Sequence, residues 1–374
     1  MRRRTLLKIL AGSALLGGGG AGGAYAFLGQ EKFGALPSGD ALQRILTSPH
    51  YAAGEFQNLI PRPILSNGSS FPAALLRSFV TKKIAPVPAS PVPSDPTGVK
   101  ALRDAGDAVI WLGHSSFLIQ LAGYRILIDP VFSPFAAPVS FSTRAFPGAT
   151  PCGVRDMPDI DCLLISHDHW DHLDYPTVLG LKPKIRRVLC GLGTGAHFRR
   201  WGFADSVIQE ADWGDTLSLG PHLRIHVTTA SHYSGRALSR NQSLWAGFLL
   251  ESPAHTIFFS GDSGYSPHFA ELGRRFRRID LALLDCGQYD EGWRFIHMTP
   301  EEAAQAADDL GARHLLPAHI GKFSLAYHPW YEPFRRITAA GENRGFRVIT
   351  PLIGTLVPLQ DRLPDFPRWW EGIA

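Results

Sequence analysis

Short apolar runs separated by polar turns characterise the chain from about residue 106 onward. Runs at 109–112, 116–121 and 124–128 predict three strands, with Ala122-Gly123 as a hairpin turn between the last two. Runs of similar length predict further strands at 161–166, 187–191, 223–229, 243–250, 255–260, 280–285, 313–317 and 346–350.

Segments with helical periodicity alternate with these strands, at 175–181, 195–201, 267–276 and 300–310. The last segment carries the clearest signals, because Thr299 can cap it, Glu302 completes a capping box and Gly311 can end it. Strands that open a domain and then alternate with helices, twice over, are typical of sheets covered by helices on their outer faces. The pattern therefore predicts an α/β layered domain.

Residues 27–105 have a different composition, with ten prolines that interrupt any long element. This composition predicts an extended arm that wraps or tethers the main body and carries little chemistry. One helix is expected within it, at 73–80. The layered domain then spans 106–360, and residues 361–374 form a C-terminal tail.

A basic start and an apolar, glycine-rich stretch mark residues 1–26. Three arginines at positions 2–4 precede the apolar residues, and Ala24-Tyr25-Ala26 is a small-x-small cleavage pattern. The start also resembles the twin-arginine export signal of bacteria. These features predict a signal peptide and a periplasmic protein, or an anchor in the inner membrane that leaves the protein facing the periplasm. The alternative is a basic start without consequence and a cytoplasmic protein.

The net charge bears on a nucleic-acid partner, and the cysteine content bears on disulfides. The formal net charge is +4, and Arg2, Arg3, Arg4 and Lys8 supply four positive charges without an acid in the same segment. The rest of the chain is therefore close to neutral, which argues against a nucleic-acid partner. Four cysteines without C-x-x-C spacing predict buried free thiols rather than disulfides.

The most informative polar residues follow the apolar run 161–166. His167, His169, Asp171 and His172 form an H-x-H-x-D-H motif. Three imidazoles and a carboxylate within six residues are a ligand set that a borderline metal such as zinc prefers. A lone histidine is usually structural, but three clustered beside acids predict a metal site and a metal-activated water.

Three further candidates lie where later predicted strands end, the usual place for site residues on such scaffolds. They are His232, Asp262 and His319. Each is a weak signal alone, because strand ends also use His and Asp in turns. Because these three residues follow the H-x-H-x-D-H motif in order along the chain, together they are a strong signal of a metal site.

Five segments carry a resemblance to a known family: Trp111–Phe117, Ile128–Ser133, Asn241–Trp245, Gly261–Tyr265 and Pro300–Ala303. With the motif, they resemble the metallo-β-lactamase fold superfamily. Within it, they resemble the branch that contains N-acylphosphatidylethanolamine-hydrolysing phospholipase D and its bacterial relatives. The resemblance implies an αββα sandwich of two mixed sheets, with a dinuclear metal site in a cleft at one edge.

Carried over position by position, the resemblance implies seven ligands for two Zn²⁺ ions, with Mn²⁺ or Fe²⁺ as alternatives. The first ion would bind to His167, His169 and His232, and the second to Asp171, His172 and His319. The carboxylate of Asp262 would bridge both ions. Two carboxylates offset the charge of two dications. A water between the ions would have its pKa lowered toward neutral, giving a hydroxide that Asp171 and Asp262 orient.

Other residues are expected to support this site. Asp129 could accept the second N–H of a ligating histidine, and His114 could play a similar part or be a packed strand-end residue. Asp168 is expected to brace the motif loop rather than bind metal. Substrate contacts are predicted at three positions, for each of which a surface or packing role is the alternative: Tyr289, His297 and Lys322.

The preferred function is phosphodiester hydrolysis of the phospholipase D type, acting on N-acyl phospholipid-like substrates. A lactonase or a β-lactamase-like amide or ester hydrolase is the first alternative, since a metal hydroxide attacks phosphorus or carbon. A non-catalytic metal-binding envelope protein is the second. The expected partners are a small-molecule or lipid substrate and a peripherally contacted membrane, and the oligomeric state is left open.

Overall fold

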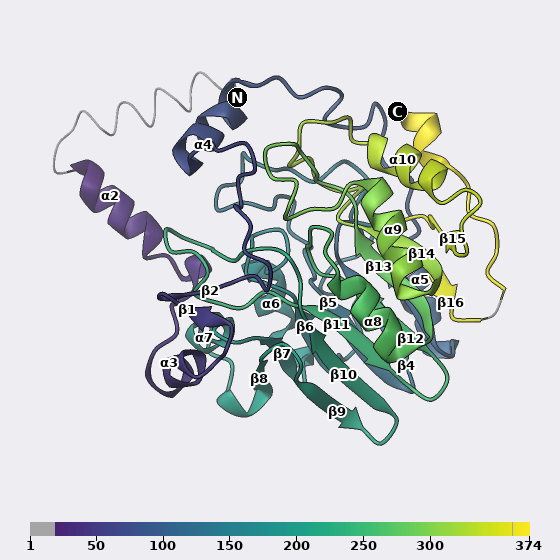
Figure 1. Cartoon of the computed structure of the whole chain (residues 1–374), viewed down its shortest axis with the longest axis horizontal. Coiled ribbons are helices and arrows are strands. Elements are labelled where there is room, and N and C mark those ends of the chain that lie inside the picture. Colours follow the sequence, from purple (N-terminus) through teal and green to yellow (C-terminus); the bar gives the residue numbers. More distant parts are fainter. Residues whose placement is uncertain (1–18, 361) are drawn as a thin grey trace.

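Two mixed sheets of seven strands lie face to face in the computed structural model, which describes residues 19–360 and 362–374 (Figure 1). The first sheet has the strand order β16-β3-β4-β5-β6-β7-β8, and the second has the order β15-β14-β13-β12-β11-β10-β9. Helices lie on the outer faces of both sheets, so the predicted αββα sandwich is confirmed.

The strands of the first sheet are β3 (Ala108–Trp111), β4 (Phe117–Leu121), β5 (Tyr124–Ile128), β6 (Cys162–Ile165), β7 (Val188–Gly191), β8 (Ile208–Ala211) and β16 (Leu356–Pro358). Those of the second are β9 (Thr216–Gly220), β10 (Leu223–Thr228), β11 (Gly247–Glu251), β12 (Thr256–Phe259), β13 (Ile279–Asp285), β14 (Ala312–Ala318) and β15 (Arg347–Val348). Strands β5 to β8 pair in parallel, as do β12 to β15. Carboxyl ends of parallel strands meet at one edge of a sheet, so the loops after these strands gather there.

Strict alternation along the buried strands builds the core. In β4, Phe117 and Ile119 belong to the core cluster between the sheets, whereas Leu118 belongs to the cluster under the helices of the first sheet. In β6, Leu164 belongs to the cluster between the sheets and Leu163 to the cluster under the helices. A strand covered on both faces must be apolar at every position, which explains the unbroken apolar runs of the sequence.

Helices α6 (Tyr175–Leu181) and α7 (Gly195–Arg200) accompany the first sheet, and α8 (His268–Phe276), α9 (Pro300–Leu310) and α10 (Glu332–Ala340) the second. Helix α9 has the predicted capping box at Thr299 and Glu302 and ends at Gly311 in the left-handed conformation. Short 3-10 turns occur at 31–33, 102–104, 182–184, 205–207 and 369–373. The sequence patterns did not predict β8, β9, β16 or α10, because these elements are short, half-exposed or at sheet edges.

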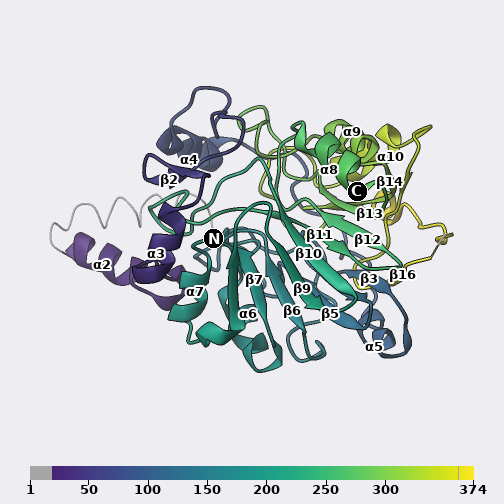
Figure 2. The same ribbon diagram turned by 60° about the horizontal axis from the view of Figure 1, so that its bottom comes forward.

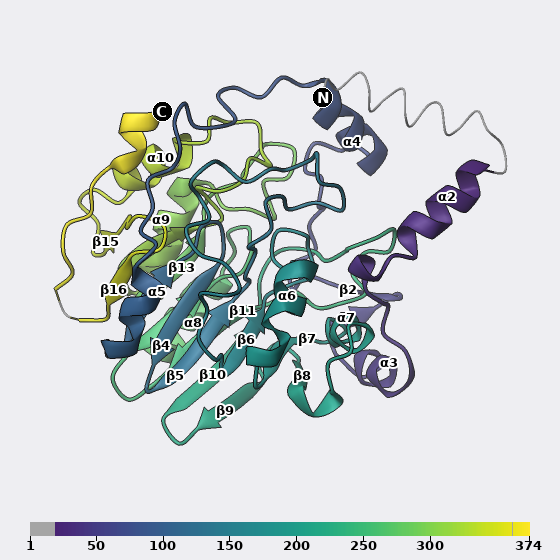
Figure 3. The ribbon, with the colours of Figure 1, turned by 180° about the vertical axis from the view of Figure 1, so that it is seen from behind.

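The arm starts on one side of the sandwich and crosses to the opposite side, so its first elements and its last helix lie far apart (Figures 2 and 3). It contains α3 (Gly39–Leu46), β1 (Tyr51–Ala52), β2 (Glu55–Phe56), α4 (Phe71–Val80) and α5 (Gly98–Ala101). The helix expected at 73–80 begins two residues earlier, where the Ser70 hydroxyl accepts a hydrogen bond from the Ala73 N–H.

The N-terminal prediction lies mostly outside the described residues, since residues 1–18 are not among them. Helix α2 (Gly19–Leu28) continues through the Ala24-Tyr25-Ala26 cleavage pattern. Among the described residues, no helix combines the length and the apolar character needed to cross a membrane. All four cysteines are buried free thiols, as predicted.

Candidate metal centre

The motif after β6 folds as a tight turn. The backbone N–H groups of His172 and Leu173 both donate to the His169 carbonyl oxygen, at 3.1 and 2.8 Å. Ser166 anchors the start of the turn, because its N–H and hydroxyl donate to the Asp129 carboxylate at 2.8 and 2.5 Å. The turn therefore brings side chains from both ends of the motif to one place.

The three histidines predicted for the first metal converge. His169 Nδ1 lies 2.9 Å from His167 Nε2 and 3.2 Å from His232 Nε2. In a tetrahedral zinc site with Zn–N bonds of about 2.0–2.1 Å, the ligand nitrogens stand about 3.3 Å apart. The three nitrogens are therefore spaced closely enough for one ion to bind them all.

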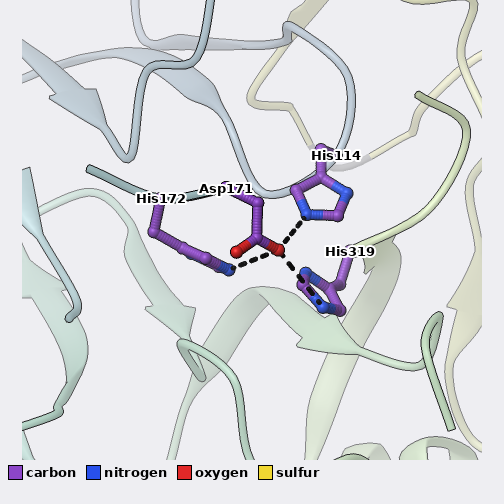
Figure 4. A group of neighbouring side chains, drawn as sticks. All are labelled: His114, Asp171, His172 and His319. Atoms are coloured by element: carbon purple, nitrogen blue, oxygen red, sulfur yellow. Dashed lines mark hydrogen bonds and ion pairs between the residues drawn. The ribbon is translucent and has the colours of Figure 1, made fainter. Parts of the chain in front are cut away.

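A second group gathers around Asp171 (Figure 4). Asp171 Oδ2 lies 3.6 Å from His172 Nε2 and 3.9 Å from His319 Nε2. The same oxygen lies 2.9 Å from His114 Nε2. The predicted ligands of the second metal are thus brought together, with His114 as an additional neighbour.

Asp262 lies between the two groups. Its Oδ2 is 3.7 Å from both His167 Nε2 and His232 Nε2, and 3.1 Å from His172 Nε2. Its other oxygen, Oδ1, is 3.3 Å from His319 Nδ1. This is the position that a carboxylate bridging two ions requires.

A sharp turn after β12 places Asp262. Gly261 has a φ of 61°, and a Cβ atom there would lie 2.6 Å from the Ala246 carbonyl oxygen, so the position favours glycine. Burial, with the nearby Asp285 carboxylate adding to it, raises the pKa of Asp262 to about 7. A carboxylate in such surroundings gains from a neighbouring cation.

The donor chemistry fits metal ions. His232 Nδ1 lies 3.1 Å from the Ile296 carbonyl oxygen, which can only accept, so Nδ1 carries the proton and Nε2 presents its lone pair. His172 Nδ1 likewise donates to Asp129 at 2.7 Å. His172 Nε2 and Asp262 Oδ1 are buried without a hydrogen-bond partner among the described residues. Such orphaned atoms are costly unless a ligand satisfies them.

Burial sets the protonation of four of the five predicted histidine ligands. Despite burial, the pKa of the fifth, His172, is instead raised, because the Asp262 and Asp171 carboxylates outweigh the effect of its burial. Burial holds the pKa of His167, His232 and His319 well below the ordinary value, and repulsion between the neighbouring imidazoles adds to the effect. Burial lowers the pKa of His169 to about 4. Neutral imidazoles are the form that binds a metal.

Two supporting residues and one predicted ligand occupy strained backbone positions. His114, Asp129 and His319 have φ values of 55°, 40° and 64°, which side chains with a Cβ adopt rarely. Asp129 accepts from His172 and Ser166, and His114 contacts Asp171, so both residues hold predicted ligands in place. Strain of this kind concentrates at functional sites, where surrounding contacts maintain it.

His297 is the one predicted substrate contact that lies at the ligand groups. Its Nδ1 lies 2.7 Å from Asp285 Oδ2, and its ring stacks on His319 with 4.9 Å between ring centroids. It also forms a cluster of ligand-type atoms with His232 and Asp262. The Asp285 carboxylate fixes the orientation of the ring, so that Nε2 is the nitrogen left for other contacts.

The other two predicted substrate contacts lie elsewhere. Lys322 is fully buried, and its ammonium donates to the carbonyl oxygens of Val131 at 2.7 Å and Leu112 at 3.4 Å. It therefore ties two strand-end loops together, and its position gives no support to a substrate contact. The Tyr289 hydroxyl donates to Glu332 at 2.8 Å, which links it to α10.

Asp168 braces the motif loop, as expected. Its carboxylate accepts from the Gly235 N–H at 2.7 Å and the Ser243 hydroxyl at 2.9 Å, and lies 3.2 Å from His197 Nε2. The buried guanidinium of Arg236 donates to the Asp168 carbonyl oxygen at 3.1 Å. These contacts hold the loop without using the carboxylate as a ligand.

The sequence patterns missed Asn58, which lies in the arm. Its amide donates to the His232 carbonyl oxygen at 2.8 Å and accepts from the His232 N–H at 3.1 Å, as a neighbouring strand would. The Trp245 indole N–H donates to the same amide oxygen at 3.1 Å. A lone Asn in a proline-rich segment carries no signal that could have revealed this contact.

The sequence matches known proteins over most of its length. Residues 124–320 match the family model described as the β-lactamase superfamily domain. An uncharacterized protein of Mycobacterium tuberculosis is 38% identical over 330 residues, which cover 87% of this chain and 88% of that protein. The chain therefore belongs to the β-lactamase superfamily, and it is a metal-dependent hydrolase of the metallo-β-lactamase fold.

Within the superfamily, the chain is related to the N-acyl-phosphatidylethanolamine-hydrolyzing phospholipase D branch. The mitochondrial enzyme of that name from Saccharomyces cerevisiae is 34% identical over 247 residues, which cover 63% of this chain and 52% of that protein. The structure of an isothiocyanate hydrolase from Delia radicum gut bacteria has a TM-score of 0.53 at 19% identity, covering 69% of this chain and 100% of that chain. That likeness shows a shared fold.

Proposed function

We propose that this protein is a phosphodiesterase of the phospholipase D type that acts on N-acyl phospholipid-like substrates with two Zn²⁺ ions. The observation that carries the reaction is the pair of ligand groups joined by Asp262, whose Oδ2 lies 3.7 Å from His167 Nε2 in the first group and 3.1 Å from His172 Nε2 in the second. The similarity to the yeast phospholipase D supports the choice of a phosphodiester.

Bound in these groups, the ions would activate a water and polarise the phosphoryl oxygen. Side chains of the protein would orient the water and the substrate. Asp171 and Asp262 would orient the attacking water. His297, oriented by Asp285, would present Nε2 to a substrate oxygen beside His319.

A lipid substrate has an apolar hollow available beside the motif. Trp170, within the H-x-H-x-D-H turn, lines a cavity of about 350 Å³ together with Phe27, Phe135, Val139 and Phe141. The lining is mostly apolar, as a pocket for acyl chains requires. No predicted ligand lines this hollow, and Trp170 alone connects it to the motif turn; its apolar lining is our argument for a lipid over a small polar diester.

A side-by-side assay tests the proposal on an N-acyl phospholipid, a soluble phosphodiester and a lactone. We expect both phosphodiesters to be cleaved and the lactone to be resistant. The substitution Phe141→Asp should lower turnover of the long-chain lipid relative to a short-chain analogue, whereas Leu46→Asp, on the separate helix α3, should not. Cleavage of the lactone without phosphodiesterase activity would overturn the proposal and favour a carbonyl hydrolase. Metal analysis of the purified protein should find about two zinc per chain.

A further inference from the structure

Exposed apolar side chains are concentrated in one short part of the arm. Among the described residues, Leu76, Val80, Ile84 and Val87 expose 57%, 69%, 67% and 56% of their surface. Leu76 and Val80 are four residues apart in α4 and therefore lie on the same side of the helix. Figure 1 shows α4 standing clear of the two sheets. We call these four side chains the arm face.

Within the arm itself, the charged residues around the arm face are all positive. Residues 56–94 contain Arg62, Arg77, Lys82 and Lys83 and no aspartate or glutamate. Lys82 is exposed, and Arg77 pairs with Asp290 of the main body at 3.5 Å. Apolar side chains flanked by cations, without acids, are typical of segments that lie on anionic lipid surfaces.

The helix that carries the arm face is connected to a predicted ligand of the metal centre through two ring contacts. Phe71, the first residue of α4, contacts the Tyr233 ring, with 6.5 Å between centroids. Tyr233 in turn packs on His169, with 4.4 Å between centroids. Phe71 lies on the other side of α4 from Leu76 and Val80. A surface bound by the arm face would therefore lie across this helix from His169, the least buried of the predicted ligands.

We infer that the arm face docks on an anionic lipid surface and brings the metal centre to its substrate. The choice of a lipid over a protein partner rests on the proposed function, because a lipid substrate must be taken from such a surface. The docking itself requires only the apolar residues and the cations of the arm.

A local fluorescence measurement tests the docking without using activity. All four native cysteines are buried, so Val80→Cys in the full chain can be labelled selectively with an environment-sensitive dye. Leu46→Cys, at a residue of α3 that is 53% exposed, is the matched control. With vesicles of phosphatidylcholine and phosphatidylglycerol, we expect a blue shift and quenching by spin-labelled lipid at position 80, and neither at position 46.

A sedimentation measurement provides the second readout. The double substitution Leu76→Glu and Val80→Glu should weaken binding to the same vesicles by about tenfold or more, because two apolar side chains no longer insert. Leu46→Glu should leave binding unchanged.

An unshifted label at position 80, or full binding by the double variant, overturns the inference. A changed oligomeric state with unchanged vesicle binding also overturns it, and assigns the face to a second copy of the chain. Vesicle binding without phospholipid cleavage leaves the docking in place and refutes the proposed function.

Discussion

The strand-end loops and the arm meet at the same centre but contribute to it by different physical means. The loops supply side chains with ligand chemistry, such as Asp262 and His319, which are 2% and 1% exposed and follow buried strands. The arm supplies no predicted ligand. It holds the backbone of His232 through Asn58 and carries an exposed apolar face. Chemistry is thus concentrated in the rigid sandwich, and support and surface properties in the segment around it.

Removal of metal should produce the largest effect. Dialysis against a chelator should abolish hydrolysis, since the buried donor atoms then have no cation to activate water. Added Zn²⁺ should restore it, and the melting temperature should fall on chelation because binding stabilises the folded state. Turnover that persists in metal-free protein, verified by elemental analysis, would place the chemistry outside the loops.

His169→Ala should come next. It removes the nitrogen that lies within 3.2 Å of both His167 and His232, so we expect kcat/KM to fall by on the order of a thousandfold or more. Far-ultraviolet circular dichroism should show the fold retained. His222→Ala, at an exposed histidine next to β10, is the control and should have no effect. Equal losses in both variants would refute the assignment.

Asp129→Asn should have an intermediate effect. This residue accepts a 2.7 Å hydrogen bond from His172 Nδ1, and loss of such a partner typically weakens metal binding by about 10–100-fold. Competition with a chromophoric chelator would measure the affinity. Asp159→Asn, at an exposed aspartate, should bind metal normally. An unchanged affinity for Asp129→Asn would mean that the strand-end loops need no such support.

Asn58→Ala should have the smallest of these effects and tests the contribution of the arm directly. Without the amide, two hydrogen bonds to the His232 backbone are lost, and we expect a several-fold weaker affinity for one of the two metals. The absorption spectrum of the cobalt-substituted protein should change with it. Asn67→Ala, at an exposed asparagine of the same arm, is the control. An unaltered cobalt spectrum would limit the arm to packing and surface contacts.

Much of the sandwich and its centre could be predicted from local patterns. The buried strands β4, β5 and β6 appear as apolar runs, and α9 is marked by its capping box. The H-x-H-x-D-H spacing indicated a metal centre because a single turn after one strand brings these residues together. Weak or absent periodicity left the edge strands β8, β9 and β16 unpredicted. Strand β16 pairs with β3, far away in the sequence, and β9 has only one buried residue.

The sequence by itself determined the ligand chemistry and the layered fold, because alternation, capping and motif spacing are set by neighbours along the chain. The tertiary structure alone decided which distant groups meet. It placed Asn58 against His232, 174 residues away. It also buried Lys322, expected at the substrate, under the loops of Leu112 and Val131. Such contacts depend on how complete sheets and the arm pack together, and no local pattern carries that information.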